Sequence, residues 1–104
     1  MGLLGKLMGA KGASNSDLVA KIKAGALIVD VRNPGEFKDG HHSRAINIPV
    51  NLVESRMNEF GPKDQAIIVY CAAGARSAMA ARMLKAAGYT NVTNGGGVND
   101  VPEV

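Results

Sequence analysis

The feature that most restricts the fold of this chain is a series of short apolar runs separated by segments with helical spacing. The runs are residues 26–31 (ALIVDV), 45–49 (AINIP), 66–70 (AIIVY) and the more polar 91–94 (NVTN). Continuously apolar runs are typical of strands buried on both faces, whereas a strand with one solvent face alternates apolar and polar residues. Strands that alternate with helices form parallel sheets. The sequence therefore predicts an α/β fold, a small parallel β-sheet flanked by helices on both faces.

Capping residues indicate where helices begin between these runs. Ser16 is expected to cap the first helix. The sequence NPGE (33–36) combines a capping asparagine, a proline suited to the first helical position and a capping-box glutamate, and it predicts a second helix. The same pattern at Asn51 predicts a third helix, to about Phe60. The alanine-rich stretch 76–87 predicts the fourth.

A chain of 104 residues is long enough for one domain with a single modest core. We expect residues 1–14 to form an N-terminal tail and residues 15–104 to form the folded domain. The tail lacks the pattern of an export signal, because Lys6 interrupts its apolar residues, and a myristoylation motif needs Ser or Thr at that position. No apolar run approaches membrane-spanning length, so a cytoplasmic location is the default expectation.

The charge of the chain argues against a nucleic-acid partner. The sequence has 12 Lys and Arg residues and 9 Asp and Glu residues, and two of the basic ones, Lys6 and Lys11, lie in the expected tail. The folded part is thus nearly neutral, and its few aromatic residues are scattered along the chain. Proteins that bind nucleic acids need a clustered basic face, and those that bind single strands also use aromatic stacking platforms.

The only cysteine, Cys71, ends an apolar run and precedes small residues, a glycine and a predicted helix (IIVYCAAGARSAMAARM, residues 67–83). A loop of this kind can turn backbone N–H groups of residues 72–76 toward the sulfur, and the helix points its positive end at the same place. Both effects lower the pKa of a thiol. The alternative is an inert core cysteine, since free cysteines are among the most buried residues. The residues after Cys71 favour the nucleophile.

Each loop residue has an expected part in this anion-binding cradle. The alanines carry no bulk that would block the cradle, Gly74 permits a positive φ, and Arg76 adds a full positive charge suited to holding an oxyanion. The predicted substrate-binding residues are Ala72, Ala73, Gly74, Ala75, Arg76 and Ser77.

Four segments resemble those of rhodanese-homology domains of the single-domain thiosulfate sulfurtransferase type, and they follow one another in the same order as in that family. Along the chain they are DVRNPGEF (30–37), GHHSRAINIP (40–49), CAAGARS (71–77) and GYTNVTNGGG (88–97). The resemblance implies that Cys71 takes sulfane sulfur from thiosulfate or a persulfide and passes it to cyanide, a thiol or an acceptor protein. It implies no metal and no organic cofactor, and we expect a monomer.

Two other functions compete with this interpretation. Related folds that handle phosphate place an arginine six positions after the cysteine, but here Arg76 is five positions after Cys71 and Ser77 occupies the sixth. The shorter loop makes a smaller cradle, which suits a sulfur atom better than a phosphoryl group. The second alternative is a non-enzymatic sulfur-carrier or regulatory binding module that a partner protein loads at Cys71.

Four charged residues are expected to support the site. Asp30 should accept backbone N–H groups at the end of its strand, and Arg32 should form an ion pair with Glu36. The resemblance places these three behind the cysteine loop. Arg44 is hypothesised to add a second positive group that draws anionic donors.

The remaining motifs have structural interpretations. Adjacent side chains diverge, so His41 and His42 are expected to stabilise a turn rather than bind a metal. The glycines at positions 95–97 follow no phosphate-binding pattern and predict a tight turn. Helical spacing predicts that Met79, Met83 and Leu84 are core residues.

The C-terminus is short for the family that the chain resembles. Family members continue past the glycines with a helix that carries an aromatic residue, whereas this chain ends with VNDVPEV. Pro102 excludes a long helix there. Residues 3–9 (LLGKLMG) are a candidate cover for the exposed edge of the core.

Overall fold

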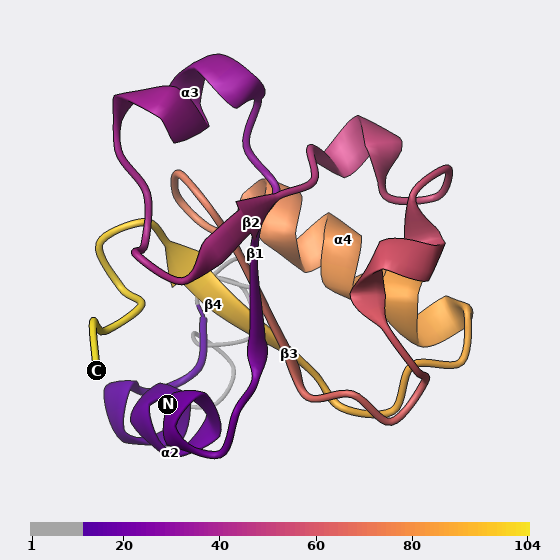
Figure 1. The fold of residues 1–104 in the computed structure, drawn as a ribbon, viewed down its shortest axis with the longest axis horizontal. Helices are drawn as coiled ribbons and strands as arrows, with labels where there is room; N and C mark the ends of the chain where they lie inside the picture. The colour runs from indigo at the N-terminus through magenta and orange to yellow at the C-terminus, as the bar shows by residue number, and fades with distance from the viewer. Residues whose placement is uncertain (1–11) are drawn as a thin grey trace, which may run out of the picture.

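The fold is a four-stranded parallel sheet with strand order β2-β1-β3-β4 (Figure 1). The structure is a computed structural model that describes residues 12–104. The strands are β1 (Leu27–Asp30), β2 (Ala45–Asn47), β3 (Ile67–Cys71) and β4 (Val92–Gly97). The predicted parallel sheet is confirmed, and the carboxyl ends of its strands meet at one edge.

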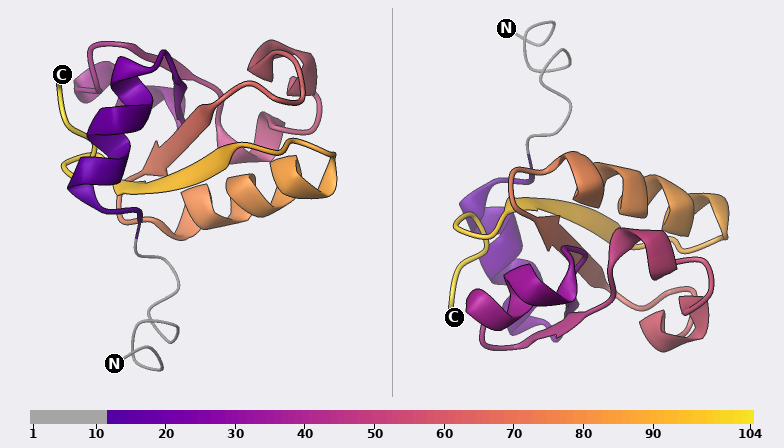
Figure 2. Two further views of the ribbon diagram at one scale, coloured as in Figure 1. Left: turned by 90° about the horizontal axis from the view of Figure 1, so that it is seen from below. Right: turned by 90° about the horizontal axis from the view of Figure 1, so that it is seen from above.

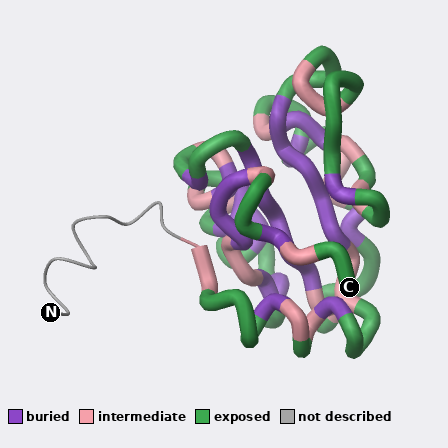
Figure 3. Tube along the Cα trace, turned by 90° about the vertical axis from the view of Figure 1, so that its left-hand side faces the viewer, coloured by how far each residue is buried: buried purple, intermediate pink, exposed green. Residues whose placement is uncertain are grey.

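Helices cover both faces of the sheet, as predicted (Figure 2). The helices are α2 (Asn15–Lys23), α3 (Pro34–Asp39), the 3₁₀ helices η1 (Val50–Leu52) and η2 (Met57–Phe60), and α4 (Ala75–Ala86). Side chains alternate along each strand, so Val29 and Val69 pack with Leu84 of α4 on one face. Ile28 and Ile68 pack with α2 on the other face. Figure 3 shows the resulting burial along the strands.

One predicted helix cap and one predicted helix are wrong. The first helix is capped by Ser14, whose Oγ accepts the Asp17 N–H at 3.3 Å, so Ser16 lies inside α2. The predicted third helix is replaced by η1 and η2, because the backbone leaves the helical region at Arg56 (φ −114°, ψ 25°). Asn51 lies inside η1, which has no side-chain cap. The NPGE capping box of α3 is confirmed.

The glycines at positions 95–97 form the end of β4 rather than a tight turn. A Cβ at Gly95 would lie 2.9 Å from Ile68 Cγ2, and a Cβ at Gly97 would lie 2.6 Å from the Ala72 carbonyl oxygen. Gly97 pairs with Cys71 in the sheet. Glycine is required because β4 approaches β3 and the cysteine loop too closely for a side chain.

The C-terminal segment after β4 has no helix and closes the face of the sheet that α2 covers. Val101 is buried beside α2, and His42 Nε2 lies 2.7 Å from the Pro102 carbonyl oxygen. The Glu103 carboxylate accepts the Ser43 N–H at 2.9 Å. The expectation from Pro102 is confirmed. The turn-stabilising interpretation of the two histidines is also confirmed, because the Arg44 N–H donates to His42 Nδ1 at 3.1 Å and His41 Nδ1 lies 2.6 Å from the Phe37 carbonyl oxygen. The candidate cover at residues 3–9 lies outside the described residues.

One predicted core residue is on the surface. Met79 is 49 % exposed, because the side of α4 that faces the sheet carries Ala80, Ala81 and Leu84 instead. Met83 is partly buried against the core, and Leu84 is fully buried, as predicted. Among residues 12–104, no helix is long and apolar enough to cross a membrane.

Candidate active site

Cys71 is the last residue of β3, and its thiol lies beneath the loop that leads into α4. The residue is only 1 % exposed. The backbone N–H of Gly74 donates to Cys71 Sγ at 3.0 Å, and the N–H of Ser77 lies at 3.4 Å from the same atom. The loop therefore turns backbone donors toward the sulfur.

Gly74 allows the loop to close. It has φ +105° and ends the loop immediately before Ala75, the first residue of α4. A residue with a Cβ avoids this left-handed conformation, so glycine is the residue suited to the position. Ala72, Ala73 and Ala75 are exposed on the outside of the loop. The positive end of the α4 dipole is thereby directed at Cys71.

The buried Ser77 and the half-buried Asn94 form a hydrogen-bond network against the thiol. Ser77 Oγ lies 3.4 Å from Cys71 Sγ and 2.7 Å from Asn94 Oδ1. Asn94 Oδ1 also accepts the Gly96 N–H at 2.9 Å, which fixes this atom as the amide oxygen. Sequence reasoning missed Asn94, whose only signal is a polar residue in a predicted strand.

The pKa of Cys71 is lowered from its ordinary value of 9.0. Burial acts in the opposite direction, because it disfavours the thiolate. The contact with the Ser77 hydroxyl and the N–H groups of Ser77, Ala73 and Gly74 outweigh burial and lower the pKa. The site thus favours the nucleophilic form of the cysteine.

Arg76 is held by Glu36 rather than left open at the rim of the loop. Arg76 Nη1 lies 2.7 Å from Glu36 Oε1, and Nη2 lies 3.0 Å from Oε2. The hydrogen bonds from Arg76 lower the pKa of Glu36 to about 2. The predicted pair between Arg32 and Glu36 is wrong, because α3 presents Glu36 to α4.

Arg32 instead pairs with Asp30 in the interior. Arg32 Nη2 lies 2.7 Å from Asp30 Oδ2, and the exposed fractions of the two residues are 7 % and 0 %. Asp30 Oδ1 accepts the Arg32 N–H at 2.9 Å, so the expected backbone contact of Asp30 is present. Arg32 Nη2 also donates to the Gly40 carbonyl at 2.6 Å. The pair stabilises the segment that carries α3, and with it Glu36.

The comparisons with known proteins identify the family. The family model of the rhodanese-like domain matches residues 14–100 of the chain. The chain belongs to the rhodanese-like domain family. A solved rhodanese with anions from E. coli has a TM-score of 0.72 and 36 % sequence identity, over 76 % of this chain and 94 % of that one.

Three curated relatives have similar identity. Allochromatium vinosum sulfurtransferase is 41 % identical over 65 % of this chain and 63 % of its own length. Thiosulfate sulfurtransferase PspE of Escherichia coli K12 is 40 % identical over 70 % and 71 %. Bacillus subtilis YrkF, named as a candidate sulfur carrier protein, is 40 % identical over 64 % and 36 %. The chain thus spans less than two thirds of the first and third of these relatives.

Arg44 is not part of the cysteine site of this rhodanese-like domain. It precedes Ala45, the first residue of β2, and β2 runs parallel to β1 and β3. Arg44 therefore lies at the amino edge of the sheet, opposite Cys71, where it lines a hollow together with Glu59. The hypothesis that Arg44 draws donors to Cys71 is not supported by this placement.

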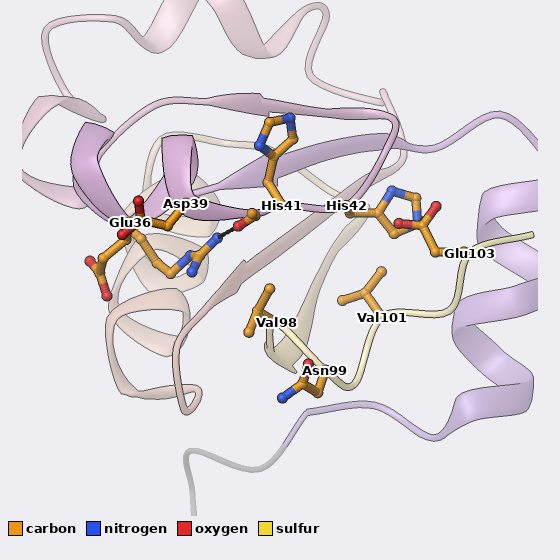
Figure 4. A pocket seen from close by; sticks show the side chains of 10 residues that line it. Glu36, Asp39, His41, His42, Val98, Asn99, Val101 and Glu103 are labelled. Atoms are coloured by element: carbon orange, nitrogen blue, oxygen red, sulfur yellow. Dashed lines mark hydrogen bonds and ion pairs between the residues drawn. The ribbon is translucent and has the colours of Figure 1, made fainter.

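A hollow of about 530 Å³ lies between α3 and the segment after β4 (Figure 4). Its lining includes Glu36, which holds Arg76, and Val98, which follows Gly97, the residue that pairs with Cys71 in the sheet. Asp39 and Glu103 add two carboxylates to the lining. In the described part of the chain, no three His, Cys, Asp or Glu residues come together as a metal-binding group.

Proposed function

We propose that this rhodanese-like domain is a sulfurtransferase in which Cys71 carries sulfane sulfur as a persulfide. The observation that carries the proposal is the set of N–H donors, from Gly74 and Ser77, that converge on Cys71 Sγ at the carboxyl end of β3. These donors favour the thiolate, and a persulfide anion on the same residue would find donors in the same cradle. The names of the relatives support sulfur transfer as the general reaction.

The proposed cycle has two displacements. The Cys71 thiolate attacks the sulfane sulfur of thiosulfate, the S–S bond of the donor breaks, and sulfite leaves with the bonding electron pair. A persulfide donor reacts in the same way and releases a thiol. Cyanide or an acceptor thiol then attacks the outer sulfur and releases the Cys71 thiolate. Each step moves one sulfur atom between nucleophiles, so neither needs an external oxidant or reductant.

Thiosulfate, a low-molecular-weight persulfide and an acceptor protein are the partners proposed for this cycle. The name of the PspE relative supports thiosulfate as a donor. Action as a monomer and a cytoplasmic location remain predictions.

A sulfur carrier that a partner protein loads is the second candidate function. The name of the YrkF relative favours it. The two functions differ in turnover. Steady thiosulfate:cyanide turnover supports the enzyme, whereas loading by a protein donor without such turnover supports the carrier.

Mass spectrometry of the intact protein tests the common step. We expect the chain to gain one sulfur atom after incubation with thiosulfate or a persulfide donor, and to lose it on addition of cyanide or a reductant. Cys71→Ser is the control and should gain none. A wild-type protein that remains unmodified by every donor would contradict the persulfide proposal.

A further inference from the structure

The two arginines at the carboxyl edge of the sheet near Cys71 are both engaged by carboxylates. Arg32 is paired with Asp30 in the interior. Arg76 presents two N–H groups to the two oxygens of Glu36, at 2.7 and 3.0 Å. This fork is the geometry with which a guanidinium binds an external oxyanion such as a sulfonate group. Glu36 therefore occupies the contact that an anionic donor would make with Arg76.

Glu36 is also held in this position by contacts within its own helix. It is the capping-box residue of α3, and its Oε1 accepts the Asn33 N–H at 3.1 Å while its own N–H donates to Asn33 Oδ1 at 2.9 Å. A donor that displaces Glu36 from Arg76 has to compete with a carboxylate fixed from the other side. The pKa of Glu36, about 2, also keeps that carboxylate ionised at neutral pH.

The hollow between α3 and the segment after β4 carries further carboxylates. Glu36, Asp39 and Glu103 all line it (Figure 4). The one arginine in its lining, Arg32, is already paired with Asp30. An anion in this hollow lies beside carboxylates, one of which, Glu36, also holds Arg76 of the cysteine loop. The repulsion increases with the charge of the donor.

We propose that Glu36 is a specificity-determining residue that selects sulfur donors of low negative charge. By holding Arg76, it leaves the backbone N–H groups as the anion cradle, which suits a singly charged thiol persulfide better than the doubly charged thiosulfate. This inference rests on the proposed sulfurtransferase function and names its preferred donor class.

Two donors that react alike but differ in charge test the proposal. Thiosulfate carries two negative charges and releases sulfite, whereas an aryl thiosulfonate (ArSO₂S⁻) carries one and releases the aryl sulfinate. Both transfer their sulfane sulfur to the Cys71 thiolate by breaking one S–S bond. The ratio of their kcat/KM values therefore reports on donor charge, with cyanide as the common acceptor.

Glu36→Gln removes the carboxylate charge while keeping an oxygen that can accept the Asn33 N–H. We expect kcat/KM to rise about fivefold for thiosulfate and about twofold for the thiosulfonate, because the attraction of a released guanidinium scales with donor charge. The gain should lie in KM rather than in kcat, and it should shrink as ionic strength increases.

The chain offers a matched control in Glu59. Its carboxylate forms the same kind of fork with Arg56, with both contacts at 2.7 Å, on η2. Glu59→Gln changes the net charge by the same amount, and we expect it to leave the donor ratio unchanged. Thermal melting establishes that each variant is folded. If Glu36→Gln does not fold, Glu36→Asp replaces it, since the shorter side chain breaks the fork. We then expect a smaller rise in kcat/KM in the same direction.

Three results would overturn the proposal: a fall in thiosulfate kcat/KM, equal changes for both donors, or a change that salt does not affect. Each of them would make Glu36 a positioning residue for the loop. A wild-type protein that neither donor converts to a Cys71 persulfide would instead contradict the proposed function, so the two failures are distinguishable.

Discussion

Removal of the Ser77 hydroxyl is the most direct test of how this protein activates its cysteine. Ser77 is fully buried, and its Oγ lies 3.4 Å from Cys71 Sγ. Ser77→Ala deletes this contact but keeps the Ser77 backbone N–H, which lies 3.4 Å from the same sulfur. The Gly74 N–H at 3.0 Å is also retained. The variant therefore isolates one donor of the cradle.

The structure sets the size of the expected change. A hydrogen bond to a charged group contributes about 1.5–3 kcal/mol. One pKa unit corresponds to about 1.4 kcal/mol. The lower end applies here, because the contact is long and the hydroxyl also lies 2.7 Å from Asn94 Oδ1, which competes for its proton. We expect the pKa of Cys71 to rise by about one unit in Ser77→Ala.

The pH dependence of alkylation by iodoacetamide measures this pKa, because the thiolate is the species that reacts. At a pH below both pKa values, the variant should react about tenfold more slowly than the wild type. Ser55→Ala is a matched control, since its hydroxyl donates to the Leu52 carbonyl on the surface. If folded Ser77→Ala titrates at the wild-type pKa or below it, the Ser77 hydroxyl does not stabilise the thiolate and the reasoning is refuted.

Three further variants test the fold around the site. The lowered pKa of Glu36 stabilises the folded state above pH 4.5, and this contribution is lost as the pH falls through about 2. When the free energy of unfolding is measured as a function of pH, the difference between the wild type and Glu36→Gln should therefore shrink as the pH falls toward 2. Gly97→Ala should lower the free energy of unfolding, measured in urea, by about 1–3 kcal/mol, because the added Cβ would lie 2.6 Å from the Ala72 carbonyl oxygen. Gly35→Ala is the control and should have no such cost, because the atom nearest to its Cβ, Asn33 Oδ1, is 3.4 Å away. Val101→Ala should cost about 2 kcal/mol in the same measurement, and a result equal to that of the exposed Val104→Ala would show that the C-terminal segment does not stabilise the domain.

Much of the site could be predicted from the sequence because it is built from neighbouring residues. Cys71, Gly74 and the start of α4 lie within one strand, loop and helix, and a short loop has few ways to close. The α3 cap was predictable for the same reason, since both hydrogen bonds of its capping box join residues three apart. The parallel sheet followed from the apolar runs, whose burial on both faces requires helical crossovers.

Contacts between distant residues were decided by the tertiary structure alone. Arg76 and Glu36 are 40 positions apart, and their pairing depends on how α3 lies over the start of α4. Local spacing favoured Arg32 as the partner of Glu36, but that arginine turns inward to the buried Asp30, because an unpaired carboxylate in the interior is costly.

The same limit explains Asn94 and the glycines of β4. No local pattern links Asn94 to Ser77, because β4 meets the cysteine loop only when it pairs with β3. The sequence by itself thus determined the α/β architecture, the cysteine loop and the α3 cap, since each follows from residues close together in the chain. Only the tertiary structure decided which carboxylate holds which arginine, because packing between elements selects those partners.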